Sequence, residues 1–266
     1  MILNQSMERN NQKFSICVDS VYSGRDFFES LEEINQLGFT HFEFWSWWNK
    51  DIKRIAKEKK RLNLQVSSFC TKFVSLVDAS KRDDYLKGLQ ETLTIAKELD
   101  CKIIITQVGD ELANVSRKEQ YRNVVNGLKA CIPILSEAGV TLVVEPLNTL
   151  VDHPGYYLYS SDEGFAIIEE VNNRHVKLLY DIYHQQIMEG HLISRILANI
   201  DKIGHFHAAG NPGRHELDMG EIHYPSILEH IKKSSYKGVV GLEYFPVDDP
   251  AAGLNKLRNL TIRRSC

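Results

Sequence analysis

The chain has 266 residues, of which 43% are hydrophobic and 25% are charged, and its formal net charge is −3. These values suit one domain with a substantial core, and the slightly acidic balance argues against the concentrated basic face that a nucleic-acid partner requires. The sequence also lacks the run of about eighteen apolar residues that crosses a membrane.

Residues 1–12 are polar and lack the apolar segment of a signal peptide, so we predict a flexible tail followed by one folded unit over residues 13–266. The five cysteines are scattered, odd in number and without a C-x-x-C pair: Cys17, Cys70, Cys101, Cys131 and Cys266. This pattern predicts buried thiols in a reducing compartment and neither a disulfide framework nor a zinc knuckle. The cytoplasm is therefore the expected location.

Eight short apolar runs alternate with longer segments of helical period along the chain. The expected strands cover residues 14–18, 41–45, 64–69, 102–106, 140–145, 176–181, 203–208 and 238–243. Several are apolar on both faces, as parallel strands covered by helices are. The helical period is clearest over 118–138, where Gly139 is expected as the C-cap and Pro133 is expected to kink the last turns.

Strands that alternate with helices form either a closed barrel or a doubly wound open sheet. The first expected strand is not followed by G-x-G-x-x-G, and the chain has no Walker A lysine motif. No low-complexity linker divides the chain. The sequence therefore predicts a single-domain α/β fold, a (β/α)₈ TIM barrel over residues 13–266.

The last four expected strands each end on a residue that can bind a metal: Glu145, Asp181, His207 and Glu243. Their separations are 36, 26 and 36 residues, about one strand–helix unit each, so all four are expected at the C-terminal mouth of the barrel. One acidic residue at a strand end is more often a helix cap or a surface group. Three converging carboxylates would repel one another, however, and a cation removes that conflict. The mostly oxygen set suits Mn²⁺, Mg²⁺ or Co²⁺, with Zn²⁺ as a further alternative.

An aromatic run closes the second expected strand. Phe42 and Phe44 are expected in the core between strands and helices. Three tryptophans are expected to form a wall of the site or a contact between subunits: Trp45, Trp47 and Trp48. Gln107 ends the fourth expected strand and is a weaker candidate for a polar contact with substrate.

The segments YDIYHQQIMEGHL (180–192) and IGHFHAAGNPGRHELDMGEIHY (203–224) carry most of a resemblance that extends from Phe14 to about Phe245. The chain resembles the xylose-isomerase-like superfamily of barrels. Within that superfamily, N-P-G-R-H-E followed by G-E-I-x-Y is similar to the hydroxypyruvate isomerase and 2-oxo-tetronate isomerase branch.

The resemblance implies that the four strand-end residues hold one divalent ion, and that Glu145 and Glu243 also act as the acid–base pair. It implies that His184 and Arg214 contact substrate, and that Glu221 is a site carboxylate that orients the histidine or another ligand. Considered without the resemblance, His184 can instead cap the helix after its strand, and Arg214 can be a surface residue of a loop.

Two positions depart from the pattern of the superfamily. The epimerase branch carries an additional glutamate six residues beyond the first ligand, where this chain has Val151. In the hydroxypyruvate isomerase branch the seventh-strand ligand can be glutamine, where this chain has His207, as the epimerases do.

The implied activity is aldose–ketose isomerisation of a small hydroxycarbonyl sugar or sugar acid. One glutamate removes a proton beside a metal-polarised carbonyl to give a cis-enediolate, and the proton returns to the neighbouring carbon. The same residues allow a ketose 3-epimerase, or a lyase or dehydratase that acts on a keto sugar, so these alternatives stay open.

Two other classes of protein are less compatible with the sequence. A nucleic-acid enzyme similar to endonuclease IV needs several more histidines at the early strand ends, which here are Val18, Trp45 and Phe69. A barrel that only binds sugar would lack one of the two catalytic carboxylates. The expected partner is a small molecule, with no nucleic acid and no membrane, and assembly into a homo-oligomer is left open.

Overall fold

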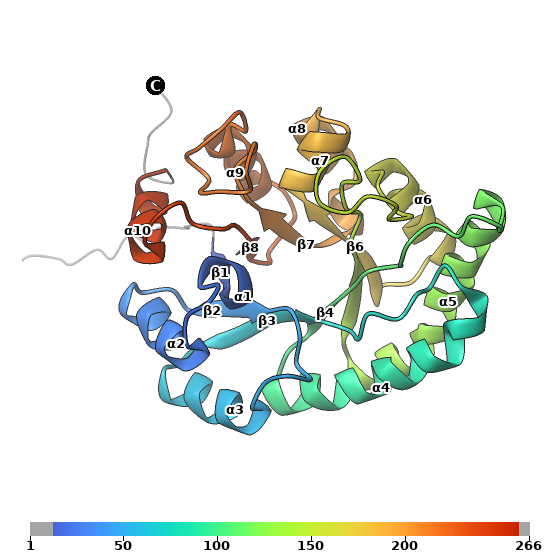
Figure 1. Cartoon of the computed structure of the whole chain (residues 1–266), viewed down its shortest axis with the longest axis horizontal. Helices are drawn as coiled ribbons and strands as arrows, with labels where there is room; N and C mark the ends of the chain where they lie inside the picture. The colour runs from blue at the N-terminus through green and yellow to red at the C-terminus, as the bar shows by residue number, and fades with distance from the viewer. Residues whose placement is uncertain (1–12, 261–266) are drawn as a thin grey trace, which may run out of the picture.

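A computed structural model describes residues 13–260, in which eight parallel strands close into a barrel in chain order. The strands occupy the centre of the ring in Figure 1, with the helices around them. This confirms the predicted (β/α)₈ barrel, whereas the predicted tail, residues 1–12, lies outside the described residues. The strands are β1 Phe14–Cys17, β2 His41–Phe44, β3 Gln65–Cys70, β4 Ile103–Thr106, β5 Thr141–Val144, β6 Val176–Asp181, β7 Ile203–Ala208 and β8 Val240–Leu242.

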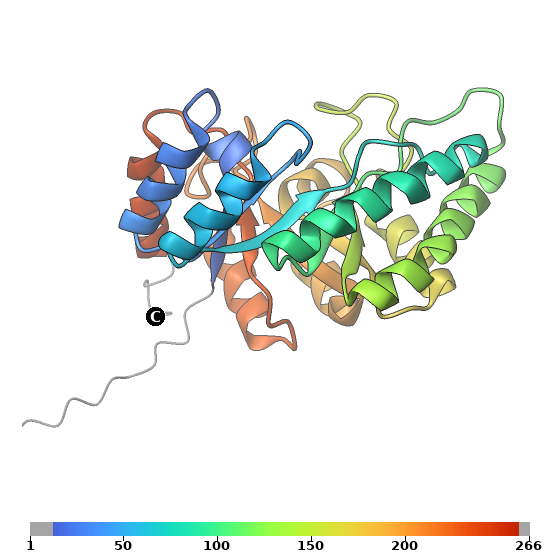
Figure 2. The ribbon, with the colours of Figure 1, turned by 90° about the horizontal axis from the view of Figure 1, so that it is seen from below.

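The strands are joined by helices that form the outer layer. Figure 2 shows the two longest, α4 and α5, along the outer wall, where they pack against each other. The helices are α1 Val18–Val21, α2 Phe27–Gln36, α3 Ile52–Arg61, α4 Arg82–Leu99, α5 Arg117–Ala138, α6 Ser161–Val171, α7 Ile182–Met188, α8 Leu192–Ala198, α9 Tyr224–Lys233 and α10 Pro250–Leu260.

The predicted helix over 118–138 corresponds to α5. Ser116 caps its start, because the Ser116 side chain accepts a hydrogen bond from the backbone N–H of Glu119. Gly139 ends it in the left-handed conformation, with φ of +63°, as expected for a C-cap. The helix continues through Pro133 as one element.

Strands β6 and β7 have the predicted bounds, and the other strands differ by one or two residues at their ends. Glu145 and Glu243 therefore directly follow β5 and β8, whereas Asp181 and His207 lie within β6 and β7. The closed parallel topology turns every strand end toward the same mouth, so these four positions converge although up to 98 residues separate them in sequence.

Apolar side chains form two groups, one on each side of the strands. The larger group fills the space between strands and helices and includes Phe42 and Phe44, which confirms their predicted place in the core. The smaller group consists of Cys70, Ile105, Val143 and Leu179. Each of these comes from a different strand, β3 to β6, and we interpret them as packing inside the barrel below the site.

Four of the five cysteines lie in the described part of the chain, and all four are buried and free, as predicted. Burial raises the pKa of Cys101 and of Cys131 to about 12, so these thiols stay protonated. Cys266 lies outside the described residues. Between residues 13 and 260, no helix combines the length and the apolar character needed to span a membrane.

Candidate active site

The four strand-end residues Glu145, Asp181, His207 and Glu243 are all buried, and one ligand atom from each lies within 4.8 Å of the others. The register of the sheet explains this arrangement, because Asp181 on β6 pairs with His207 on β7. Both side chains therefore point to the same face of the sheet, into the barrel. The structure thus brings together the four residues that the sequence predicts as metal ligands.

The donor atoms of this group fit a divalent cation. His207 Nδ1 lies 3.4 Å from Glu145 Oε1 and 3.4 Å from Glu243 Oε2. Glu145 Oε1 and His207 Nδ1 are buried without a hydrogen-bond partner. Buried polar atoms without partners are uncommon in folded proteins, and a cation would satisfy these. Three carboxylates and one imidazole suit a hard or borderline ion such as Mn²⁺, Mg²⁺ or Zn²⁺.

The charges at this site also favour a cation. Burial lowers the pKa of His207, but the carboxylates of Glu243 and Glu43 outweigh burial and hold that pKa well above its usual value. Burial raises the pKa of Asp181 above its usual value even though Arg214 opposes the shift. For Glu243, burial acts to raise the pKa, but the positive charge of Arg214 prevails and leaves the pKa low. The site is an electronegative pocket that attracts positive charge.

Asp181 has a second role as the cap of helix α7. Its Oδ1 accepts hydrogen bonds from the backbone N–H groups of Tyr183 (2.8 Å) and His184 (3.1 Å). The sequence left open whether His184 caps this helix, and in the structure the cap is Asp181. His184 is fully buried, lines the site cavity and has no hydrogen-bond partner at Nε2. Burial and the charge of Arg214 lower the pKa of His184 to about 3, so its ring is neutral.

Arg214 enters the site from the N-P-G-R loop after β7. Gly213 and Arg214 both adopt positive φ angles, +93° and +57°, which turns the arginine inward. Its guanidinium forms an ion pair with the Glu243 carboxylate, and Nε donates to the Glu243 carbonyl oxygen at 3.3 Å. Only 13% of the side chain is exposed, so Arg214 is part of the site and not a surface residue.

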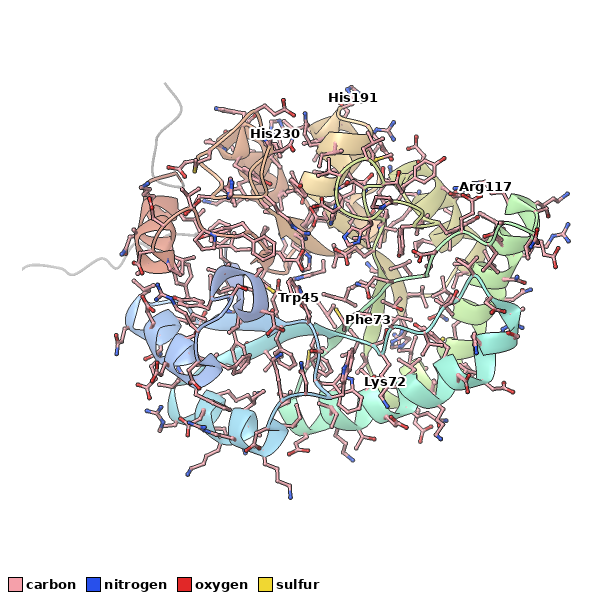
Figure 3. The ribbon with its side chains drawn as sticks, viewed as in Figure 1. Trp45, Lys72, Phe73, Arg117, His191 and His230 are labelled. Atoms are coloured by element: carbon pink, nitrogen blue, oxygen red, sulfur yellow. The ribbon has the colours of Figure 1, made fainter. Side chains whose placement is uncertain are left out.

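The cavity above the ligands has a volume of about 510 Å³, and two side chains predicted from the sequence contact the carboxylates in it. Trp45 Nε1 donates to Glu243 Oε1 at 2.6 Å, and Gln107 Nε2 donates to Glu145 Oε2 at 2.9 Å. Figure 3 shows Trp45 and Phe73 near the centre of the ring, whereas His191 and His230 lie at its periphery. Trp45 and Gln107 therefore orient the candidate acid–base pair.

The other two tryptophans of the aromatic run do not line the cavity. Trp47 is half-buried and donates to Thr92 Oγ1 at 3.1 Å, on helix α4. Trp48 is 40% exposed and packs edge-on against Phe73, with the ring centroids 5.3 Å apart. Trp45 alone of the three forms part of the site wall.

Sequence reasoning missed Glu43, which is buried inside the barrel on β2. Glu43 Oε1 lies 3.1 Å from His207 Nε2, and Glu43 Oε2 lies 3.1 Å from His205 Nε2. The same Oε2 accepts from Ser67 Oγ at 2.9 Å. Glu43 has the position of a carboxylate that orients a ligating histidine. In the sequence, Glu43 stands between Phe42 and Phe44, and this alternation is equally typical of a strand whose polar residues face outward.

Glu221, which the resemblance implied for that orienting role, lies elsewhere. It is exposed, and its Oε1 accepts hydrogen bonds from Asn211 Nδ2 (2.6 Å) and Gln186 Nε2 (3.2 Å). It does not line the site cavity. Glu221 was expected to orient His207 or another ligand. The carboxylate beside His207 is instead that of Glu43, because Glu43 lies on an inward-facing strand position and Glu221 lies in a loop.

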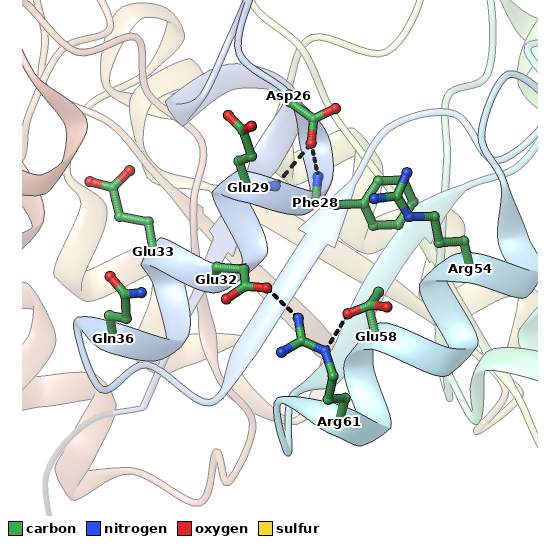
Figure 4. Close-up of a pocket in the computed structure, with 9 residues that line it drawn as sticks. All are labelled: Asp26, Phe28, Glu29, Glu32, Glu33, Gln36, Arg54, Glu58 and Arg61. Carbon is green, nitrogen blue, oxygen red and sulfur yellow. Dashed lines mark hydrogen bonds and ion pairs between the residues drawn. The ribbon is translucent and has the colours of Figure 1, made fainter.

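A second depression lies between helices α2 and α3 (Figure 4). Acidic side chains dominate its lining, and Arg61 is paired there with Glu32 and Glu58. Arg54 stacks over the Phe28 ring at 3.7 Å. These side chains pair with one another on the outer helix layer, and none of them lines the cavity at the strand ends. The depression is therefore not a candidate active site.

Comparison with known proteins identifies the family of this chain. Residues 31–260 match the family described as "Xylose isomerase-like TIM barrel". The hydroxypyruvate isomerase of Escherichia coli (strain K12) is 30% identical over 251 residues, which cover 91% of this chain and 96% of that protein. The 2-oxo-tetronate isomerase of Cupriavidus necator is 43% identical over 120 residues, which cover 45% of this chain and 46% of that protein.

Among solved structures, one from Brucella melitensis described as an AP endonuclease, family 2, superposes with a TM-score of 0.89. It is 26% identical, and the match covers 93% of this chain and 98% of that one. The chain therefore belongs to the xylose isomerase-like TIM barrel family and groups there with isomerases.

Proposed function

We propose that this protein is a divalent-metal-dependent isomerase that interconverts the aldose and ketose forms of a small hydroxycarbonyl sugar or sugar acid. The observation that carries the proposal is the placement of two buried carboxylates, Glu145 and Glu243, each 3.4 Å from His207 Nδ1 and both on the wall of one cavity. The names of the two isomerase relatives support a short keto or aldehyde acid as substrate.

Glu145, Asp181, His207 and Glu243 would hold the ion. When bound, a divalent ion supplies positive charge beside the reacting carbonyl and so favours loss of the neighbouring C–H proton. The protein's own task is then to accept that proton and return it to the adjacent carbon, which converts one carbonyl isomer into the other.

Glu145 and Glu243 are held differently for this task. Glu145 Oε2 accepts a hydrogen bond from Gln107, and its Oε1 lies on the side of His207 Nδ1, where the ion would bind. Both oxygens of Glu243 have partners, Trp45 and Arg214. Arg214 is the cation available to a substrate carboxylate or distal hydroxyl, and when it turns to that group it frees Glu243 Oε2. Substrate binding and exposure of the second carboxylate are thereby linked.

A ketose 3-epimerase is the second candidate, because two carboxylates on opposite faces of a carbon also invert that carbon. The position where the epimerase branch has its additional glutamate is Val151, which is 62% exposed and outside the cavity lining. This observation favours the isomerase. A lyase or dehydratase shares the first proton removal and differs only in the fate of the intermediate.

An endonuclease activity, which the description of the Brucella structure names, is less well supported. Within residues 13–260, the candidate metal groups are two in number, and both include His207. A centre with several zinc ions would need separate ligand sets. A small molecule is the proposed partner, and the four buried free thiols support a cytoplasmic location.

The test is a screen of three- to six-carbon hydroxycarbonyl compounds in D₂O with protein loaded with Mn²⁺, Mg²⁺ or Co²⁺. An isomerase incorporates deuterium at C1 or C2 and interconverts aldose and ketose, whereas a 3-epimerase labels C3. Failure to exchange a C–H proton in any compound would contradict the proposed function.

A further inference from the structure

The loop that follows β5 contains a fully buried asparagine, Asn148, whose amide orientation is fixed by the backbone. Its Oδ1 accepts hydrogen bonds from the backbone N–H groups of Val151 and Asp152, both at 3.0 Å. Backbone N–H groups only donate, so the atom facing them is the amide oxygen. The other atom, Nδ2, is therefore a donor.

Asn148 Nδ2 directs its two hydrogens to two acceptors. One is Asp152 Oδ2 at 2.5 Å, and the other is the ring nitrogen His184 Nδ1 at 2.7 Å. The backbone N–H of Asn148 also points to His184 Nδ1, at 3.3 Å. Because an amide nitrogen accepts no hydrogen bond, a proton on His184 Nδ1 would face two donors. The neutral ring must carry its proton on Nε2.

The protonated nitrogen is the one that faces the site. His184 Nε2 is buried, has no hydrogen-bond partner, and belongs to a residue that lines the cavity. Asp181 Oδ2 is 3.6 Å away, beyond hydrogen-bond distance. The rings of His153 and Tyr183 lie with centroids 5.4 Å and 5.3 Å from the His184 ring, which limits its rotation. A fixed donor without an acceptor is costly unless a ligand supplies the acceptor.

We propose that Asn148 is a positioning residue that keeps His184 protonated at Nε2, so that His184 offers a neutral N–H donor to a substrate oxygen. The inference rests on the proposed function, since the oxygen that gains negative charge during proton transfer is the one this donor would stabilise. Its chemistry requires a substrate with a carbonyl or hydroxyl oxygen next to the reacting carbon, on the His184 side of the cavity.

The test exchanges the side chains of Asn148 and Asp152. In the double variant N148D/D152N, the overall charge is unchanged, and the amide at 152 can donate to the carboxylate at 148. That carboxylate then faces His184 Nδ1 as an acceptor and draws a proton onto Nδ1. The single variant D152N is the matched control, because it keeps the Asn148 donor and the Nε2–H tautomer.

Two-bond ¹H–¹⁵N spectra of Mg²⁺-loaded, ¹⁵N-histidine-labelled protein report which ring nitrogen carries the proton, and H184Q assigns the His184 signals. We expect Nε2–H in the unmodified protein and in D152N, and a protonated Nδ1 in N148D/D152N. At a pH where the spectra show one ring proton in the double variant, we expect its kcat to fall by about 100-fold relative to D152N.

A proton on Nδ1 in the unmodified protein, or a bare Nδ1 in N148D/D152N, would overturn the inference. The inference would also be overturned if the proton moved to Nδ1 in N148D/D152N while kcat stayed within twofold of that of D152N. If the unmodified protein turns over no substrate, the proposed function fails, and the spectra still decide whether Asn148 sets the tautomer.

Discussion

Strands β5 to β8 and the residues directly after them contribute the four candidate ligands, whereas β2, β4 and the residues directly after those strands contribute side chains that contact the ligands. Glu145, Asp181, His207 and Glu243 come from the second half of the barrel. From the first half, Gln107 and Trp45 each donate to a ligand carboxylate, and Glu43 lies beside His207. In the proposed function, one half would supply the groups that bind the ion and react, and the other half would hold them in position.

The largest expected effect comes from the ligand half. In E145Q, the residue loses its charge and its ability to accept a proton, so we expect kcat to fall by about 10²–10⁴-fold. The measurement is deuterium exchange with the best substrate of the screen. E137Q is the matched control, because Glu137 is exposed on α5. Full activity of E145Q would remove this glutamate from the acid–base pair.

The supporting half is tested at Glu43 with E43Q, which removes the charge beside His207 Nε2. Loss of a carboxylate that orients a ligand is expected to weaken metal binding by about 10–100-fold. Titration calorimetry with Mn²⁺ measures the affinity. E221Q serves as the comparison, since Glu221 is exposed and outside the cavity, and its affinity should match that of the unmodified protein. Equal losses in both variants would contradict the assignment of the orienting role to Glu43.

The contact between the halves depends on Gly241 of β8. A Cβ added there would lie 2.2 Å from Glu43 Oε1 and 2.7 Å from His207 Cδ2. G241A should therefore lower the free energy of unfolding by about 1–3 kcal/mol, which chemical denaturation measures. In G88A the added Cβ meets Lys72 Cβ at 3.6 Å, an ordinary contact, so the stability should be unchanged or slightly higher. If the free energy of unfolding of G241A equalled that of the unmodified protein, Glu43 and His207 would have moved apart at no cost, which would contradict the prediction.

The smallest expected effect is the change of metal affinity with each unit of pH. The pKa of His207 is raised, because the nearby carboxylates outweigh burial, so near neutral pH the metal-free ring carries a proton. A protonated ring cannot bind a metal, and binding must release that proton. Affinity should rise by up to about tenfold per pH unit below this pKa. Calorimetry in buffers of different ionisation enthalpy counts the released protons, and a count of zero would contradict the raised pKa.

The fold and the ligand half were predictable from local patterns. Parallel strands covered by helices are apolar on both faces, and a charged residue that closes such a run stands out, as Glu145 does after TLVV. The spacing of about one strand–helix unit then places such residues at one mouth. Arg214 and His184 were found through the resemblance of their segments to a known family, and periodicity gave no separate signal for them.

The supporting half was not predictable in the same way. Glu43 occupies a strand whose alternation of polar and apolar residues looks the same whether the polar face points to solvent or into a barrel. Glu221 was expected to orient His207 or another ligand, but its carboxylate accepts hydrogen bonds from Asn211 and Gln186 instead. Asn148 acts through a hydrogen bond to a residue 36 positions away, and no local pattern encodes such a contact.

The sequence by itself determined the number of strands, their order and the residues that end them, because those features follow from local periodicity and chain connectivity. Only the tertiary structure decided which side chain stands beside each ligand, which oxygen keeps a free lone pair, and which ring nitrogen faces the cavity. These depend on the closure of the barrel, which brings β1 against β8 and Glu43 within 3.1 Å of His207, 164 residues further along the chain.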